Sequence, residues 1–356
     1  MNLFRKHWKI ISCGVFIGIL ATLFQKFGNP ANMGICVACF ERDIAGALGF
    51  HRIPIVQYLR PEIPAFVLGS FFASLVFKEF KPRGGSLPLV RFFLGFFAML
   101  GALVFLGCPW RAFLRLAGGD GNAIAAIVGL IVGVYIGVKF LKSGYTLGRN
   151  YSAYKFTGFL MPLMMLGIFL LLIVKPAIPN GAPFFSLKGP GSQHAPIILS
   201  FVGAFIIGIF AQRTRFCTMG AIRDIILLKD FHLASGVIGL LIFAFLSNLL
   251  LGQFNPGFAG QPVAHTNQLW NFLGMVLSGL AYALAGGCPG RQLFLSGEGD
   301  IDAGVFVIGM ITGAGFAHNF AIAASPAGIA RFSALAVIIG LLFCIATGFS
   351  MRKRLA

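Results

Sequence analysis

A short motif occurs twice in this chain, as Gly-Cys-Pro-Trp-Arg at 107–111 and as Gly-Cys-Pro-Gly-Arg at 287–291. Each copy closes a long apolar run, and each leads within one short segment to an aspartate, Asp120 or Asp300. A repeat of this kind, at matched places in two halves of one chain, indicates a site to which both halves contribute.

The composition around the motif is that of a membrane protein. Of the 356 residues, 58% are hydrophobic and only 11% are charged, whereas soluble proteins carry about 25% charged residues. The net charge of +18 comes from small groups of Lys and Arg between apolar runs. Such groups are typical of topology signals and of contacts with the lipid bilayer, so we predict a membrane protein and no nucleic-acid partner.

The apolar runs predict an all-α integral membrane protein. A span needs about 20 apolar residues, and about ten stretches reach that length, with nine as the alternative: 8–27, 62–80, 88–107, 122–142, 156–174, 195–212, 231–251, 267–286, 302–323 and 331–350. Four other segments are helix-like but too short to span: 30–50, 109–117, 213–230 and 289–296. We expect these four to be re-entrant half-helices, which are stable at membrane depth only inside protein or beside a water-filled cavity.

A second set of residues repeats at nearly the same spacing. It is a cysteine followed by an adjacent Arg-Asp pair, and it consists of Cys36, Arg42 and Asp43 in the first copy and Cys217, Arg223 and Asp224 in the second. We therefore predict two repeats, 1–174 and 193–356, joined by a Pro- and Gly-rich linker at 175–192.

Five spans in each half would place the two repeats in the membrane in opposite directions. Such inverted repeats are common in transporters, and here they would bring the half-helices together near the midplane. If the N-terminus is inside, most of the 28 Lys and Arg lie on the inner side. Both termini are therefore predicted to be cytoplasmic.

The Gly-Cys-Pro-x-Arg motif also predicts a local geometry. Glycine permits a chain reversal and proline suits the first position of a helix, so Cys108 and Cys288 should be N-caps of two short helices. A helix N-terminus carries partial positive charge and free N–H groups, which attract anions. Arg111 and Arg291 either strengthen this attraction by binding substrate or brace the half-helices, with Asp120 and Asp300 as their expected partners; the local residue pattern is compatible with both roles.

The second repeated set has two expected roles. Cys36 and Cys217 occupy matched places and are expected to line the same path as the other two cysteines. Adjacent Arg and Asp residues cannot face one way on a helix, so we expect each member of the structural ion pairs Arg42, Asp43, Arg223 and Asp224 to find its partner on a neighbouring element.

The Cys36-Val37-Ala38-Cys39 segment is also a C-x-x-C motif, which suggests thiol-disulfide chemistry. Its second cysteine has no counterpart in the other repeat, where Gly220 stands instead. The alternative function is therefore a membrane oxidoreductase that uses Cys36 and Cys39. Neither a metal-binding cluster nor a phosphate-binding loop is evident in the sequence, so no cofactor and no enzymatic activity are predicted.

These motifs resemble the YeeE/YedE family of bacterial inner-membrane proteins, as does the run Phe-Cys-Thr-Met-Gly-Ala-Ile-Arg-Asp at 216–224. The resemblance implies uptake of thiosulfate along a path of cysteines, matched here by Cys108, Cys217 and Cys288, to which the internal repeat adds Cys36. The longer string at 107–123 is similar to the YedE branch linked to selenium metabolism. Relatives often act with a TusA-like sulfur-carrier protein, which would be a separate partner here.

The sequence thus predicts an inner-membrane transporter for a small sulfur or selenium compound, such as a thiosulfate-like anion. Thiols are soft, polarisable groups that suit a sulfur or selenium atom. We expect Cys36, Cys108, Cys217 and Cys288 to contact that atom and Arg111 and Arg291 to offset part of the anion's dehydration.

Overall fold

The computed structural model describes every residue except 1, 177, 179–180 and 353–356, with the side chains of 2–6 also left out. Lys353 and Arg354, which contribute to the predicted charge asymmetry, lie outside the described residues. The predicted all-α class is confirmed, because the described chain is helical apart from one two-residue pairing of β1 (Arg83–Gly84) with β2 (Tyr151–Ser152) and one short 3-10 helix, η1 (Pro190–Ser192).

Nine helices of the described chain are long and apolar enough to cross a membrane. They are α1 (Asn2–Lys26), α4 (Pro88–Phe105), α6 (Asn122–Lys142), α7 (Lys155–Val174), α8 (Ile197–Thr214), α10 (His232–Leu250), α11 (Gln268–Ala285), α13 (Ile301–Asn319) and α14 (Ser333–Ser350). The tenth predicted span, 62–80, forms the 15-residue α3 (Glu62–Val76). At 1.5 Å per residue, α3 is shorter than the hydrocarbon core of about 30 Å.

Four short helices form inside the segments predicted to be re-entrant. They are α2 (Val37–Ala47), α5 (Pro109–Ala117), α9 (Thr218–Leu228) and α12 (Pro289–Gly297). Each is preceded by a cysteine as its N-cap, and the four caps are Cys36, Cys108, Cys217 and Cys288. The N-cap prediction for Cys108 and Cys288 is therefore confirmed, and the same geometry extends to the other two repeated cysteines.

The helices of the first half pack against those of the second half in matched pairs. Helix α1 packs against α10 and α3 against α8, while α4 packs against α13 and α6 against α11. Two glycines allow the last two pairs to approach closely: a Cβ at Gly309 would collide with the carbonyl of Phe92, and a Cβ at Gly129 with that of Phe272. Helices α7 and α14 depart from the pairing, since α7 packs on α3 whereas α14 packs on α4 and α11.

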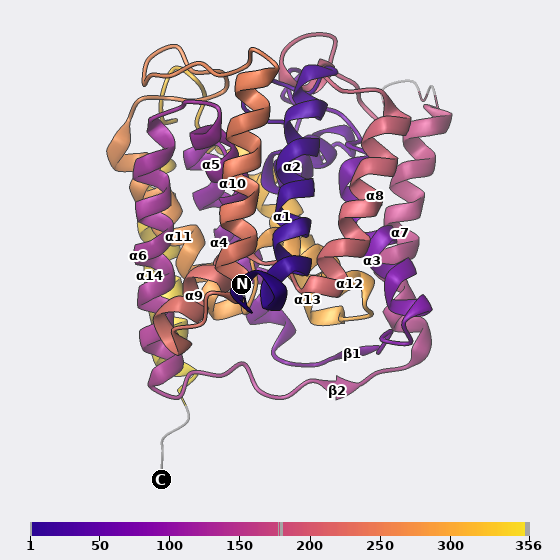
Figure 1. Ribbon diagram of the computed structural model, residues 1–356, viewed down its shortest axis with the longest axis vertical. Coiled ribbons are helices and arrows are strands. Elements are labelled where there is room, and N and C mark those ends of the chain that lie inside the picture. The colour runs from indigo at the N-terminus through magenta and orange to yellow at the C-terminus, as the bar shows by residue number, and fades with distance from the viewer. Residues whose placement is uncertain (1, 177, 179–180, 353–356) are drawn as a thin grey trace.

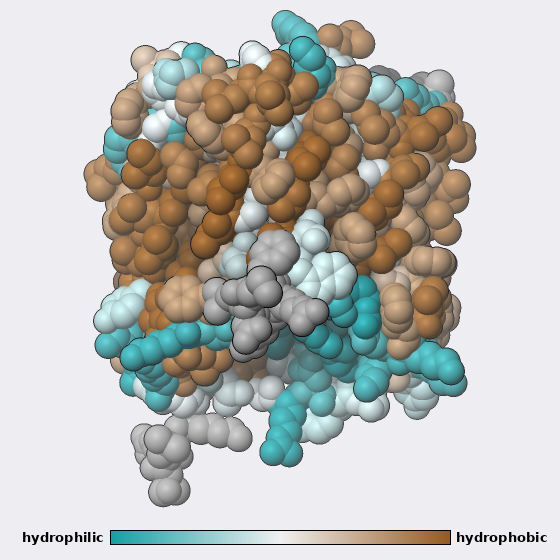
Figure 2. All heavy atoms as spheres, viewed as in Figure 1, coloured by the Kyte–Doolittle hydropathy of each residue, from teal (hydrophilic) through white to brown (hydrophobic). Residues whose placement is uncertain are grey.

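The overall arrangement places the short helices in two groups at different depths (Figure 1). Helix α1 rises from the lower end of the molecule and α14 descends to that same end, while α2 and α5 lie in the upper half and α9 and α12 in the lower half. Figure 2 shows a broad hydrophobic belt around the middle, with hydrophilic residues gathered at the lower end. Together with the nine spans, this belt identifies a multi-pass membrane protein.

Candidate functional site

The four repeated cysteines form two close pairs, one in each group of short helices. In the lower pair the backbone N–H of Cys288 donates to Cys217 Sγ at 3.4 Å. Cys217 Sγ also accepts the N–H of Gly220 at 3.2 Å, which caps α9. In the upper pair the thiols of Cys36 and Cys108 contact each other, and Cys36 Sγ caps α2 by accepting the N–H of Cys39 at 3.2 Å.

At each pair, the N-termini of two short helices converge on one thiol. The backbone N–H groups of Ala38 on α2 and Arg111 on α5 lie within reach of the Cys108 thiol. Those of Thr218 on α9 and Arg291 on α12 lie within reach of the Cys288 thiol. Because each helix N-terminus carries partial positive charge and orphan N–H donors, both places suit an anion.

Trp110 fills the space between the two motif copies. Its ring packs against Phe66, Phe216 and Phe294, with ring centroids 5.9, 5.4 and 6.1 Å away. The indole also lies against Gly290, where an added Cβ would come within 3.0 Å of the ring. The variable position of the motif therefore holds a large side chain, that of Trp110, in one copy and no side chain in the other, where Gly290 stands. This difference lets the two copies pack against each other.

A polar vestibule of about 370 Å³ leads from the lower end of the molecule to Cys217. It is lined by Thr214, Arg215, Cys217, Arg223, Asp224, His232, Leu233, Gly286 and Arg291. Three arginines against one aspartate make it an environment that attracts anions. Cys217 is 5% exposed, whereas Cys36, Cys108 and Cys288 are fully buried, so in this conformation the vestibule admits solvent to Cys217 alone of the four cysteines.

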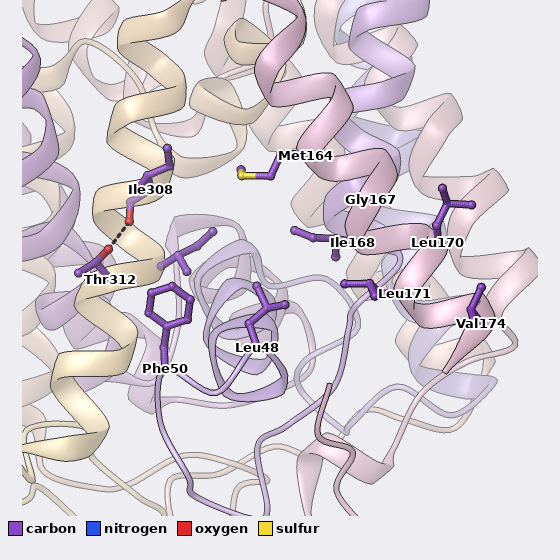
Figure 3. Close-up of a pocket in the computed structure, with 11 residues that line it drawn as sticks. Leu48, Phe50, Met164, Gly167, Ile168, Leu170, Leu171, Val174, Ile308 and Thr312 are labelled. Atoms are coloured by element: carbon purple, nitrogen blue, oxygen red, sulfur yellow. Dashed lines mark hydrogen bonds between the residues drawn. The ribbon is translucent and has the colours of Figure 1, made fainter. Parts of the chain in front are cut away.

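A larger cavity of about 630 Å³ lies elsewhere, between α7 and α13 beside the end of α2 (Figure 3). Its described lining consists of uncharged residues such as Leu48, Phe50, Met164 and Leu171, and the hydroxyl of Thr312 is bonded to the Ile308 carbonyl. An apolar groove without a free donor does not suit a small anion, so this cavity is a poorer candidate site than the vestibule and the thiol pairs.

Arg111 braces the upper group instead of pairing with an acid. Its guanidinium is fully buried and donates to three backbone carbonyls, those of Asn32 at 2.8 Å, Val263 at 3.0 Å and Leu106. It therefore ties α5 to the loops before α2 and before α11. Arg291, by contrast, lines the vestibule and pairs with Glu298 at 3.1 Å.

The expected partners of the two aspartates need correction. Asp120 pairs with Arg115 at 2.6 Å, and Asp300 pairs with Arg83 at 2.8 Å, so neither meets the arginine of its own motif. Asp120 follows a turn at Gly119 with φ of +99°, and this turn folds the aspartate back toward the C-terminal end of α5. Arg115 lies at that end and can pair with Asp120, whereas Arg111 lies near the start of α5.

The adjacent Arg-Asp pairs also differ from expectation. Arg42 bonds directly to Asp43 at 2.7 Å, and Arg223 to Asp224 at 2.8 Å, because a long arginine side chain can curl around the helix to its neighbour. Only Asp43 has in addition a partner on another element, Arg60, whose Nε lies 2.8 Å away. Arg60 also donates to the carbonyls of Pro190 and Gln193, which fixes the linker onto the upper group.

The sequence did not indicate the surroundings of Cys39 or the isolation of Glu41. Arg111 Nη1 donates to Cys39 Sγ at 3.5 Å, and Cys39 Sγ lies 2.7 Å from Cys36 Sγ. Glu41 is fully buried, and neither of its carboxylate oxygens has a hydrogen-bond partner among the described residues. Neither Cys39 nor Glu41 is part of the internal repeat, because Gly220 and Ile222 stand at the corresponding positions of the second half. For Glu41, the available signal is a third charged residue, directly before the repeated Arg42-Asp43 pair and without a charged counterpart in the other repeat.

Two comparisons with known proteins find similarity to sulfur transport proteins. Residues 213–350, which include α9, α12 and the vestibule, match the family model described as Sulphur transport. A stretch of 100 residues is 38% identical to the thiosulfate transporter TsuA of Spirochaeta thermophila, covering 27% of this chain and 28% of the relative's own length. Over residues 213–350 the chain is therefore similar to the sulphur transport family, the YeeE/YedE group that its repeated motifs resemble.

Proposed function

We propose that this protein carries a small inorganic anion containing sulfur or selenium across the membrane, along a path formed by Cys36, Cys108, Cys217 and Cys288. The observation that carries this proposal is the convergence of two helix N-termini at each thiol pair. Positive helix ends attract the oxygens of such an anion, while the thiols contact its soft sulfur or selenium atom. Thiosulfate and selenium oxyanions have both kinds of atom.

The vestibule supports a direction for this path. Arg215, Arg223 and Arg291 surround its mouth at the end of the molecule where the hydrophilic residues gather. The positive-inside rule assigns that end to the cytoplasm, together with both termini, and a bacterial inner membrane is the expected location. In this orientation the anion enters past Cys36 and Cys108, passes Trp110, and leaves past Cys288 and Cys217 into the vestibule.

The proposal also includes the two inverted repeats and a cytoplasmic sulfur carrier. The matched helix pairs support two inverted repeats, 1–174 and 193–356, with 175–192 as the linker between them. A vestibule that opens to the cytoplasm also gives a separate TusA-like sulfur carrier a place to receive the product.

The experiment that tests the function is uptake into liposomes that contain the purified chain. Thiosulfate, selenite and sulfite are supplied in parallel to wild-type protein and to empty liposomes. Uptake of at least one of the sulfur or selenium anions above the empty liposomes is expected, and a preference for selenite would support the selenium branch. If correctly folded protein takes up none of the three anions above the level of empty liposomes, the proposed substrate class is ruled out.

A second candidate function rests on the 2.7 Å separation of the Cys36 and Cys39 sulfurs. In a membrane oxidoreductase these thiols would form a disulfide and pass two electrons and two protons to a quinone, which becomes a quinol. Cys39→Ser separates the two functions, because it abolishes quinone reduction but leaves all four N-cap thiols and the cap of α2 in place. Anion uptake by Cys39→Ser, without any quinone reduction by wild type, would favour the transporter.

A further inference from the structure

Glu41 differs from the other acids of this protein in its surroundings. All ten acidic residues lie in the described part of the chain, and nine of them have a hydrogen-bond or ion-pair partner there. Glu41 is the exception: its exposed fraction is 0%, and both carboxylate oxygens are without a partner among the described residues.

The position of Glu41 connects it with the thiol pairs. It lies on α2, whose N-cap is Cys36, and it is close enough to the phenol of Tyr282 to act on it electrostatically. The same phenol is within electrostatic range of Cys108 and of Cys288. Tyr282 is fully buried on α11, and its phenol is thus within electrostatic range of the acid and of one thiol of each pair.

The groups on the helices around α2 leave Glu41 without a counter-charge. Helix α2 packs against α3, α4, α12 and α13. The titratable and charged groups on these helices and on α2 itself, with Tyr282, are Cys36, Cys39, Arg42, Asp43, Glu62, Arg91, Arg291, Glu298, Asp302 and His318. From other elements, Arg60 reaches α2 at Asp43, Arg111 reaches it at Cys39, His51 reaches it at the carbonyl of Arg42, and Cys108 reaches it at Cys36. Arg42 is held by Asp43, Arg291 by Glu298, and Arg91 lies beside Asp302. An ionised carboxylate in such a site is costly, so the site favours the neutral acid.

We propose that Glu41 binds the proton that is carried together with the anion. This inference rests on the proposed function, because an anion that enters a cytoplasm at negative potential must be driven by another ion. Protonated Glu41 is neutral in the empty, dry site. It keeps its proton while the anion passes, releases the proton to the cytoplasm, and takes up another from the outer side before the next anion, so that each cycle carries one proton inward and lowers the negative charge moved by one. Tyr282 is the positioning residue, because its phenol is within electrostatic range of Glu41 and of Cys108 and Cys288.

Thiosulfate flux in liposomes tests the coupling, since thiosulfate stays fully ionised near neutral pH and cannot carry the proton itself. In wild-type liposomes, an alkaline interior should drive accumulation of labelled thiosulfate, and a thiosulfate gradient should carry protons inward. Glu41→Gln keeps the shape and the neutral charge of the protonated acid. It should retain exchange of labelled for unlabelled thiosulfate at equal pH but lose the response to the pH gradient by at least tenfold.

The matched control is Glu62→Gln, which changes another buried acid whose Oε1 accepts from Asn29 Nδ2 at 2.9 Å. This variant should keep the response to the pH gradient. Exchange without any pH response in wild type, or an unchanged pH response in Glu41→Gln, overturns the coupling and leaves the transport function standing. Absence of exchange in wild type contradicts the transport function itself, and the coupling with it.

An infrared measurement tests the proton site without transport. Wild-type protein at neutral pH should show the carbonyl stretch of a buried carboxylic acid, and the spectrum of Glu41→Gln should lack it. If Glu41→Gln fails to fold, Tyr282→Phe provides a second variant, in which that stretch should shift because the neighbouring hydroxyl is removed. A wild-type spectrum with Glu41 fully ionised overturns the proposal.

Discussion

The backbone N–H of Cys288 donates a hydrogen bond of 3.4 Å to the Sγ of Cys217, so the N-cap residue of α12 is bonded to the N-cap residue of α9. The two residues are far apart in the sequence, and the bond joins the positive ends of two short helices at one sulfur. In the proposed function, the lower thiol pair therefore acts as a single site for the anion, and the role of each cysteine can be tested one residue at a time.

Replacement of Cys108 or Cys288 by alanine should nearly abolish anion uptake while the protein stays folded. Each change removes one contact to a charged substrate, worth about 1.5–3 kcal/mol, which corresponds to a loss of roughly 10- to 100-fold. Liposome uptake and size-exclusion chromatography measure the two effects. Cys344→Ala, a fully buried cysteine of α14, is the matched control. Full uptake by both motif variants would exclude the thiols from the path.

Arg111 and Arg291 should respond differently to replacement by glutamine. Arg111→Gln leaves up to three buried carbonyls without a donor, each at a cost of about 1–3 kcal/mol, so the yield and thermal stability of folded protein should fall. Arg291→Gln can still donate to Glu298 and should fold, but its vestibule has one positive charge fewer and uptake should weaken. Thermal unfolding in detergent and liposome uptake give the two readouts. An Arg111→Gln protein as stable as wild type would refute the bracing role.

Gly290→Ala should slow transport through its contact with Trp110. The new Cβ would lie 3.0 Å from the indole Cζ2 and 3.1 Å from Cε2, so the ring must shift, at an overpacking cost of about 1–3 kcal/mol. The smaller ring of Trp110→Phe, combined with Gly290→Ala, should restore part of the rate. Gly167→Ala is the control, since a Cβ there meets nothing within 4 Å in the described chain. Equal uptake rates in Gly290→Ala and wild type would count against a tight fit.

Acid should destabilise the protein through two histidines in the upper loops. Burial lowers the pKa of His51 and of His265, and nearby Arg42 and Arg115 lower it further. The backbone N–H groups of Ile53 and Asn267 donate to the Nδ1 atoms of these rings, which requires that nitrogen to be unprotonated. Since the unfolded chain binds protons more readily at these positions, stability is complete above the ordinary histidine pKa of about 6.5 and falls as the pH drops below it.

Thermal unfolding measured between neutral pH and about pH 5 checks this expectation, because that interval spans the ordinary histidine pKa. His265→Gln keeps a donor for the carbonyl of Val104 but cannot be protonated, so its melting temperature should decline less with acid than that of wild type. Parallel declines in wild type, His51→Gln and His265→Gln would show that other groups govern the acid response.

Local sequence determined the elements of the candidate site. Nine of the predicted spans, the four short helices and the N-cap positions of Cys108 and Cys288 depend on apolar length and on the Gly-Cys-Pro turn, and both are properties of neighbouring residues. The internal repeat then indicated which four cysteines belong together. The 62–80 stretch failed as a full span because its helix ends at Val76, before the chain turns toward β1.

Tertiary structure alone decided the partners of the charged residues. The choice of Arg115 over Arg111 by Asp120 and the fit of Trp110 against Gly290 depend on which segments the packing of the two halves brings together. The isolation of Glu41 has the same origin, since the cations around α2 are held by other acids or, in the case of Arg111, by backbone carbonyls. Sequence neighbours specify helices and caps through short-range geometry, whereas burial and charge pairing are set by contacts between distant segments.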